Sequence, residues 1–262
     1  MRKAISKDGT SIAFDESGVG PVVVLVGGAL TQRSAPGVRS MAALLAQHFT
    51  VINFDRRGRG DSGDTTPYAV AREVEDIEAL IDESGGSAFV YGHSSGAALA
   101  LEAARTLGIK IKKLALYEPP FMANENDDRS PADHVTYLKE LLTAGRRGDM
   151  VEYFMTEVTG APAEAVAPMK NSPMWAELLP AAHTLLYDLA IMGDYSVPTG
   201  RISSIKIPTL ALDGGASPGW AANSAQMLVD TLPNAQRRTL KGQTHNVDPA
   251  TLAPVLVEFF ET

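Results

Sequence analysis

The chain has 262 residues, of which 45% are hydrophobic and 21% are charged, a balance typical of a soluble globular protein. Its net charge of −8 argues against nucleic acid and anionic membrane surfaces as partners. The absence of cysteine excludes disulfides, thiolate chemistry and cysteine-bound metals.

The beginning of the chain, MRKAISKDGTSIAF, has a basic start but lacks the apolar segment of a signal peptide. Nowhere does an apolar run approach the roughly 18 residues that a membrane helix needs. We therefore expect a cytoplasmic protein.

Strand and helix patterns alternate through the first half of the chain. AISKDGTSIAF alternates around Asp8-Gly9, which predicts a hairpin. PVVVLVGG is continuously apolar and β-branched, as expected of a strand buried on both faces of a parallel sheet. Further strands are predicted at 50–55, 88–92 and 112–118, and helices at 41–49, 68–86 and 97–108.

This alternation stops at about residue 121, after which the pattern is helical or irregular up to residue 200. It resumes with a strand at 207–215, a helix near 218–231, a short strand near QRRTLKG and a final helix near 250–260. The sequence thus predicts an α/β core formed by residues 1–120 and 201–262. A helical insertion, residues 121–200, interrupts this core.

A serine lies between the strand and the helix predicted around residue 94. GHSSG at this junction is the G-x-S-x-G nucleophile elbow, and its spacing selects Ser94 as the nucleophile. Side chains at Gly92 and Gly96 would collide with the strand and helix packed against the turn. The backbone N–H of Ser95 can face an oxyanion. The alternative is a serine that only caps a helix.

Seven segments occur in an order that points to a known family: the N-terminal hairpin, VVVLVGG, INFDRRGRGDSG, YGHSSG, YEPP, PTLALDGG and GQTHNV. In these segments and in their order, the chain resembles an α/β-hydrolase-fold enzyme over essentially its whole length. The resemblance implies a mostly parallel sheet with helices on both faces, and a helical cap formed by the insertion. It also implies a second oxyanion N–H after Gly27-Gly28, which here replace the usual His-Gly pair. That donor is Ala29, although the glycines could simply form a tight turn.

His245 is the candidate general base. It lies in KGQTHNVDP, a polar loop between the last strand and the last helix, where the family presents its base. It also follows the serine and the acid in chain order, as the family requires. The other histidines are at positions 48, 93, 134 and 183.

The acid is missing from its usual place. Most family members carry it after the strand matching TLALDGGASP, and that position holds Ser217. Glu118, at the end of the strand after the nucleophile strand, is our preferred replacement, because catalytic groups collect at this edge of an open α/β sheet. In this the chain resembles the mycotoxin lactone hydrolases. Asp213 remains an alternative, and Asp248 is more simply interpreted as a helix N-cap.

Glu118 could instead be an ion-paired glutamate that faces Arg56 or Arg57. The loop FDRRGRGDSG that contains these arginines is a signature of the family. Its charged residues are expected to build the loop rather than to contact substrate.

The insertion is expected to determine the substrate. Six of the nine methionines fall in it, together with Trp175, and flexible thioethers suit an adaptable apolar pocket as well as ordinary helix packing. His183 and Tyr187 lie one helical turn apart and are candidates for contact with a leaving group. The six methionines are Met122, Met150, Met155, Met169, Met174 and Met192.

Together these features predict a serine hydrolase of small, apolar carboxylic esters or lactones that needs no cofactor and no metal. Ser94, His245 and Glu118 would form its triad, and Ala29 and Ser95 its oxyanion hole. The serine excludes dehalogenase and epoxide hydrolase chemistry, which need an aspartate at the elbow. The alternatives are a C–C bond hydrolase or lyase on the same triad, and a non-catalytic ligand-binding protein of this fold. The natural substrate and the oligomeric state are not predicted.

Overall fold

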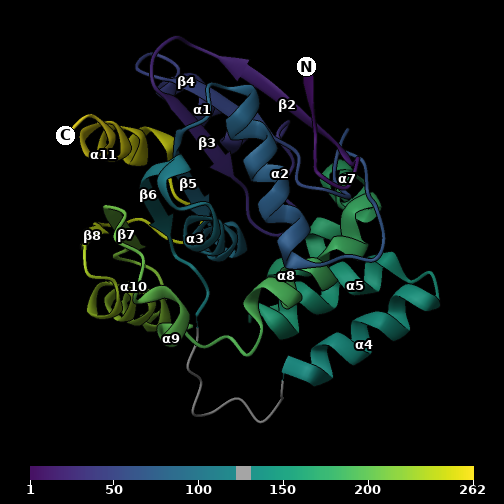
Figure 1. Cartoon of the computed structure of the whole chain (residues 1–262). Helices are drawn as coiled ribbons and strands as arrows, with labels where there is room; N and C mark the ends of the chain where they lie inside the picture. The colour runs from purple at the N-terminus through teal and green to yellow at the C-terminus, as the bar shows by residue number, and fades with distance from the viewer. Residues whose placement is uncertain (122–130) are drawn as a thin grey trace.

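The computed structural model describes residues 1–121 and 131–262 (Figure 1). Its described residues form one eight-stranded sheet with the order β1-β2-β4-β3-β5-β6-β7-β8. Strands β3 to β8 run parallel to their neighbours, and the β1–β2 hairpin joins β4 in antiparallel register. The strands are β1 Arg2–Ile5, β2 Ser11–Ser17, β3 Val22–Val26, β4 Thr50–Phe54, β5 Ala88–His93, β6 Ile111–Tyr117, β7 Thr209–Gly214 and β8 Ala235–Leu240.

The predicted hairpin is confirmed at the N-terminal edge of this sheet. Ala4 pairs with Ile12, and the turn between the strands contains Gly9 at a φ of +86°, a conformation that glycine adopts without steric cost. The Asp8 carboxylate accepts a hydrogen bond from the Thr10 N–H at 3.0 Å, which is the Asx-turn contact expected of this residue type.

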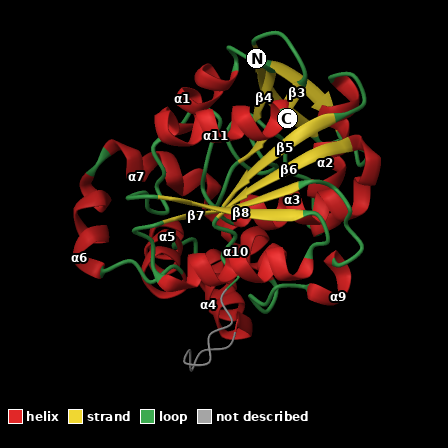
Figure 2. Ribbon diagram, turned by 90° about the vertical axis from the view of Figure 1, so that its left-hand side faces the viewer, coloured by secondary structure: helices red, strands yellow, loops and turns green. Residues whose placement is uncertain are grey.

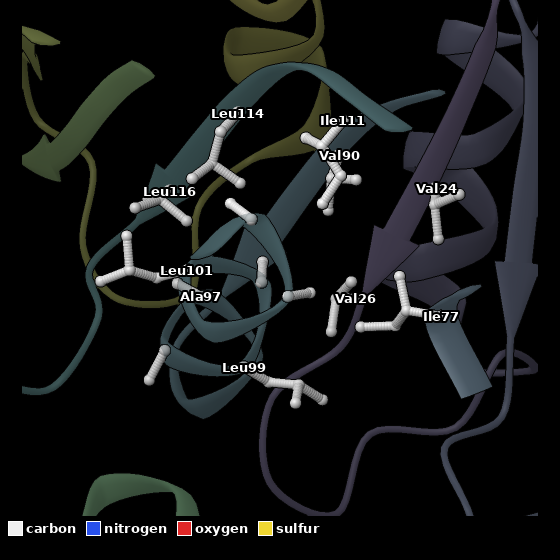
Figure 3. Close-up of a cluster of buried hydrophobic side chains, with 14 of the residues drawn as sticks. Val24, Val26, Ile77, Val90, Ala97, Leu99, Leu101, Ile111, Leu114 and Leu116 are labelled. Carbon is white, nitrogen blue, oxygen red and sulfur yellow. The ribbon is translucent and has the colours of Figure 1, made fainter. Parts of the chain in front are cut away.

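Helices cover both faces of the sheet (Figure 2). Alternate residues of β3 face opposite ways: Val24 and Val26 pack with the core of α2, α3 and α10, and Val23 and Leu25 pack with that of α1 and α11. Each fully buried Val or Leu contributes roughly 2 kcal/mol. Figure 3 shows the first of these clusters, packed around α3. The helices are α1 Pro36–Leu45, α2 Val70–Glu83, α3 Ser95–Leu107, α10 Gly219–Thr231 and α11 Pro249–Glu261.

The described residues between β6 and β7 form helices and turns but no strand. Most of these helices gather on one side of the molecule, and they bury a hydrophobic cluster of their own that includes Leu138, Met150 and Leu185 (Figure 1). Leu30, from the loop after β3, packs into this cluster and connects it to the sheet. Met122 lies outside the described residues. The helices are α4 Pro131–Thr143, α5 Arg147–Tyr153, α6 Ala163–Val166, α7 Pro173–Leu178, α8 Leu185–Met192 and α9 Thr199–Ile202, and the short 3-10 and π turns among them are Phe154–Val158, Ala167–Asn171 and Leu179–Thr184. A further 3-10 turn, Gly108–Lys110, lies between α3 and β6.

Three predicted helices have different bounds in the structure. The helix predicted at 68–86 is the shorter α2, Val70–Glu83, and the other two are α1 and α3. Helix α1 begins at Pro36 and ends at Leu45, whereas the sequence pattern placed the helix at 41–49. Its first turn contains Pro36 and Gly37, which obscure the helical pattern although proline suits the first helical position. Helix α3 begins two residues before the predicted start, at Ser95, directly after Ser94.

Across residues 1–121 and 131–262, the helices are all too short or too polar to cross a membrane.

Candidate active site

Ser94 occupies a sharp turn between β5 and α3. Its φ of 56° and ψ of −129° fall in a region that residues with a side chain rarely adopt, so the backbone is strained here. The Ser94 N–H donates to the Tyr117 carbonyl at 3.0 Å, which fixes the turn to the neighbouring strand β6. Such a turn presents the serine hydroxyl at the carboxyl edge of the sheet.

The two glycines that flank the turn are sterically required, as the sequence predicted. A Cβ on Gly96 would lie 2.3 Å from the Val26 carbonyl oxygen and 2.5 Å from that of Gly27. One on Gly92 would lie 2.6 Å from the Gly96 oxygen. These contacts are with backbone atoms that cannot move aside, so helix α3 packs this closely on β3 only because side chains are absent.

His245 and Glu118 are in direct contact. His245 Nδ1 lies 2.7 Å from Glu118 Oε2, and the glutamate side chain is completely buried. The other carboxylate oxygen, Oε1, accepts hydrogen bonds from the Gly214 N–H at 2.7 Å and from Ser217 Oγ at 2.5 Å. Glu118 itself has a φ of 45°, so its backbone is strained, like that of Ser94.

Glu118 is held in its ionised form. Burial alone would raise the pKa of this carboxyl, but the hydrogen bonds from His245, Ser217 and Gly214 outweigh it and hold the pKa below the ordinary value. A carboxylate can only accept at Oε2, so the proton of a neutral His245 ring lies on Nδ1. The Nε2 atom is then left as the acceptor that a general base needs.

His93 connects strand β5 to the loop that carries His245. Its Nε2 atom lies 2.9 Å from the His245 carbonyl oxygen, and the two rings are 4.9 Å apart. Burial, and then the neighbouring His245, lower the pKa of His93 to about 4, so the ring is neutral and donates through Nε2–H. In the described residues no hydrogen bond joins Ser94 to His245. Such contacts in enzymes without substrate are commonly long and shorten when substrate binds.

The alternative acids have other partners. Asp213 forms an ion pair with Arg237 at 2.8 Å and also accepts from Thr239. Asp248 caps α11 by accepting from the Ala250 N–H at 3.1 Å, as expected from the sequence. Neither carboxylate contacts His245 in the described structure.

The arginines considered as partners of Glu118 also bind elsewhere. Arg56 forms a bidentate pair with Glu73, with distances of 2.6 and 2.7 Å, and Arg57 forms one with Asp76, with distances of 2.8 and 2.7 Å. Both arginines therefore join the loop after β4 to helix α2.

Ala29 and Ser95 lie on the two segments that meet at Ser94. A Cβ on Gly28 would lie 2.9 Å from Ser94 Cβ, so the loop before Ala29 packs directly against the serine. Within the described part of the chain, the N–H groups of Ala29 and Ser95 donate to no protein acceptor. Both donors are therefore available to an oxyanion.

Sequence reasoning missed one group beside these donors, a buried ion cluster formed by Arg56, Arg59, Glu73 and Asp188, each 1–2% exposed. Asp188, on α8, accepts from Ser95 Oγ at 2.8 Å and from both arginines. The loop arginines were visible in the sequence, but no local pattern marked Asp188 as their partner.

The three insertion residues named from the sequence have structural contacts. His183 Nε2 and Tyr187 Oη both lie close to the Asp64 carboxylate, at 3.1 and 2.9 Å. The Tyr187 ring also stacks on Tyr68 at 3.8 Å. Trp175 is buried in the hydrophobic cluster of the insertion. Contact of these three residues with substrate stays a prediction.

A cavity of about 290 Å³ adjoins His245 and His93 on the side of α1 and α11. Met41, Tyr91 and Val247 give it a mainly apolar lining, and none of the three insertion residues contributes to it. The described residues contain no cluster of three or more His, Asp or Glu side chains placed to hold a metal ion.

Comparison with known proteins agrees with this architecture. A model of the alpha/beta hydrolase family matches residues 22–255. An alpha/beta hydrolase from Sphaerobacter thermophilus is 56% identical and has a TM-score of 0.92, and the match covers 99% of this chain and 100% of that one.

Two more distant structures share the fold. A thermophilic esterase from Thermogutta terrifontis is 20% identical with a TM-score of 0.75, covering 99% of this chain and 97% of that one. A meta-cleavage product hydrolase from Pseudomonas fluorescens is 17% identical with a TM-score of 0.70, covering 100% and 97%. From the family model and the 56% identity over nearly the full length, we conclude that the chain belongs to the α/β hydrolase family.

Proposed function

We propose that this protein is a serine hydrolase of carboxylic esters or lactones that works through an acyl-enzyme on a Ser94–His245–Glu118 triad. The observation that carries this proposal is the 2.7 Å contact between His245 Nδ1 and the buried, ionised Glu118. A carboxylate in this position orients the imidazole and stabilises the imidazolium that forms when the ring takes up a proton.

The proposed reaction assigns one step to each group of the site. His245 Nε2 takes the proton of Ser94 as Oγ attacks the carbonyl carbon of the substrate. The Ala29 and Ser95 N–H groups bind the resulting oxyanion, and each such donor contributes about 3–4 kcal/mol in the transition state. The imidazolium then gives its proton to the leaving alcohol. Water, activated by the same histidine, releases the acid and restores Ser94.

We also propose that residues 121–200 act as a cap over this site and select the substrate. Support comes from Ser95, whose Oγ bonds to Asp188 of α8, and from Leu30, which packs into the insertion cluster directly after Ala29. The insertion thus contacts both segments that carry the oxyanion donors.

A substrate panel tests this proposal. The purified protein, with and without EDTA, is assayed on short-chain p-nitrophenyl esters, lactones, thioesters and a substrate cleaved at a C–C bond. We expect turnover of esters or lactones that EDTA does not change and that falls by about 10⁴-fold or more in Ser94→Ala, which should fold normally.

Other outcomes of the panel identify the alternatives. Turnover of the C–C substrate alone indicates C–C hydrolysis or lyase chemistry on the same triad. An absence of turnover together with tight ligand binding indicates a non-catalytic binding protein. Ester hydrolysis that persists in Ser94→Ala contradicts the proposed mechanism.

A further inference from the structure

The peptide between Gly28 and Ala29 carries a charged donor on its carbonyl. Arg59 Nη1 donates to the Gly28 oxygen at 2.6 Å. The Gly28 carbonyl and the Ala29 N–H are the two ends of one resonant amide, so electron density drawn toward the oxygen leaves the nitrogen. A charge-assisted hydrogen bond at one end of an amide therefore makes the N–H at the other end a stronger donor.

We propose that Arg59 is a positioning residue of the oxyanion hole, which fixes and polarises the Gly28–Ala29 peptide while being aligned itself by Asp188 and Thr184 of the insertion. This inference rests on the proposed function, because Ala29 meets an oxyanion only if Ser94 attacks a carbonyl group. It follows that the geometry of the oxyanion hole depends on how the insertion packs against the core.

Three acceptors fix the plane of the Arg59 guanidinium. Besides the Gly28 oxygen, these are Asp188 Oδ2, at 2.7 Å from Nη2, and Thr184 Oγ1, at 3.1 Å from Nε. Arg59, Asp188 and Thr184 are each at most 1% exposed, so bulk water does not reach these donors and acceptors. Turning the guanidinium away from Gly28 would break the other two hydrogen bonds, because its donors form a rigid planar fork.

The same carboxylate reaches the other side of the oxyanion hole. Asp188 Oδ1 accepts from Ser95 Oγ at 2.8 Å and from Arg56 Nη1, also at 2.8 Å. Burial raises the pKa of Asp188, but Arg59 and Arg56 outweigh it and hold the pKa below its ordinary value. One ionised group of α8 is thus connected to the segments of both proposed donors.

The cluster acts at short range. Arg56 and Arg59 contribute two positive charges, and Glu73 and Asp188 two negative ones, so the buried group is neutral overall. A neutral cluster has a weak long-range field. Its effect on an oxyanion therefore passes through its hydrogen bonds to Gly27, Gly28 and Ser95. Of these, the bond from Arg59 to the Gly28 oxygen acts on the peptide that carries the Ala29 N–H, so removing it should be detectable.

A purely structural role is the competing explanation, and Arg57 provides a matched control for it. Arg57 is in the same loop, is completely buried and has a bidentate carboxylate partner in Asp76. Its other acceptors are Asp8 and the Arg72 carbonyl, and it does not contact the Gly28–Ala29 peptide in the described structure. Damage to the loop should change kcat and Ki alike in the Arg57 and Arg59 variants. A loss confined to the oxyanion hole should change them only in the Arg59 variant.

The experiment compares Arg59→Lys with Arg57→Lys. In the first variant a single ammonium nitrogen replaces the two nitrogens that hold the Gly28 oxygen and Asp188 Oδ2, so the planar fork that fixes both acceptors is lost. For each variant we would measure the melting temperature, kcat and KM on the ester that the enzyme cleaves best, and the Ki of a trifluoromethyl ketone. The adduct that this ketone forms with the serine places an oxyanion in the hole.

Removal of a complete oxyanion donor lowers kcat by about 10²–10³-fold, so we expect about a tenfold fall for the weakened donor in Arg59→Lys. The Ki of the ketone should rise by a similar factor while KM stays nearly constant. In Arg57→Lys the melting temperature should fall comparably while kcat and Ki stay near wild type. Equal kinetic losses in both variants, or wild-type kcat and Ki in Arg59→Lys, would overturn the inference.

Thr184→Val provides a second test that keeps every charge. It removes the acceptor of Arg59 Nε and also the hydrogen bond from Thr184 Oγ1 to the Ala181 carbonyl. We expect the same direction of change in kcat and Ki with a smaller size. If Arg59→Lys does not fold, unchanged kcat and Ki in Thr184→Val overturn the inference. Ser94→Ala separates the two proposals: an active Ser94→Ala contradicts the proposed function, whereas an inactive one beside unaffected Arg59→Lys and Thr184→Val contradicts only the role of Arg59.

Discussion

Ser217 Oγ donates a hydrogen bond to Glu118 Oε1 at 2.5 Å. Ser217 stands where most family members carry the acid, so the residue at the usual position of the acid supports the carboxylate that replaces it. The two positions, on the loop after β7 and at the end of β6, lie within hydrogen-bonding distance of each other. A carboxylate from either strand is therefore expected to reach the same edge of His245.

The exchange of acids can be tested with Ser217→Asp. In the wild-type background this substitution should lower kcat, because two carboxylates in contact repel each other and one of them takes up a proton. In Glu118→Gln the same substitution should restore part of the lost activity, because it supplies the missing charge. The measurement is a double-mutant cycle on kcat/KM. A further loss of activity in the Glu118→Gln background would show that Ser217 is not an equivalent site.

Glu118→Gln and Asp213→Asn form a matched pair for the identity of the acid. Loss of the corresponding charge in a related triad lowers kcat by about 10⁴-fold, and we expect a loss of this order for Glu118→Gln. Asp213→Asn weakens the pair with Arg237 and should reduce stability with little effect on kcat. Steady-state kinetics with thermal unfolding separates the two effects. The reverse result, an inactive Asp213→Asn and a nearly normal Glu118→Gln, would assign the triad acid to Asp213.

His93 should make the free energy of unfolding depend on pH. Its pKa is about 4 in the folded protein, against about 6.5 for a free histidine. As pH falls from about 6.5 to about 4, the unfolded chain takes up a proton that the folded one does not, so stability falls over this interval. His93→Asn removes this titration and should flatten that part of the profile in urea unfolding. A variant with the wild-type slope between these pH values would show that His93 is not its source.

Alanine substitution should change the free energy of unfolding in opposite directions at two glycines. Gly96→Ala places a Cβ against the carbonyl oxygens of Val26 and Gly27, and we expect a loss of about 1–3 kcal/mol, as for other overpacked sites. Gly219, the first residue of α10, has open space around its Cβ position. Gly219→Ala should stabilise the protein by about 0.5 kcal/mol through the unfolded state. Chemical denaturation measures both, and a neutral Gly96→Ala would contradict the close approach of α3 to β3.

The sequence predicted the elements whose patterns are local. Buried strands such as 88–92 are continuous apolar runs, and the elbow at Ser94 has a fixed spacing, so both could be recognised without a structure. Asp188 could not. It is a single acid in the apolar helix LLYDLAIM, and its partners Arg56 and Arg59 are more than 120 residues away in the chain.

His183 and Tyr187 illustrate the same limit. Their spacing of four residues brings the two rings to 5.8 Å from each other, although His183 lies in the 3-10 turn Leu179–Thr184 and Tyr187 in α8. Their common partner, Asp64, belongs to the loop after β4 and depends on how the insertion packs on the core. Local periodicity contains no information about that packing.

The central claim is that Ser94 is the nucleophile of a triad, and covalent labelling by a fluorophosphonate tests it most directly. We predict that mass spectrometry finds one adduct on the wild-type protein, located on Ser94, that labelling is slower in His245→Gln, and that Ser94→Ala is unlabelled. Labelling of another residue, equal labelling of Ser94→Ala, or no adduct on a preparation that hydrolyses esters would contradict the claim.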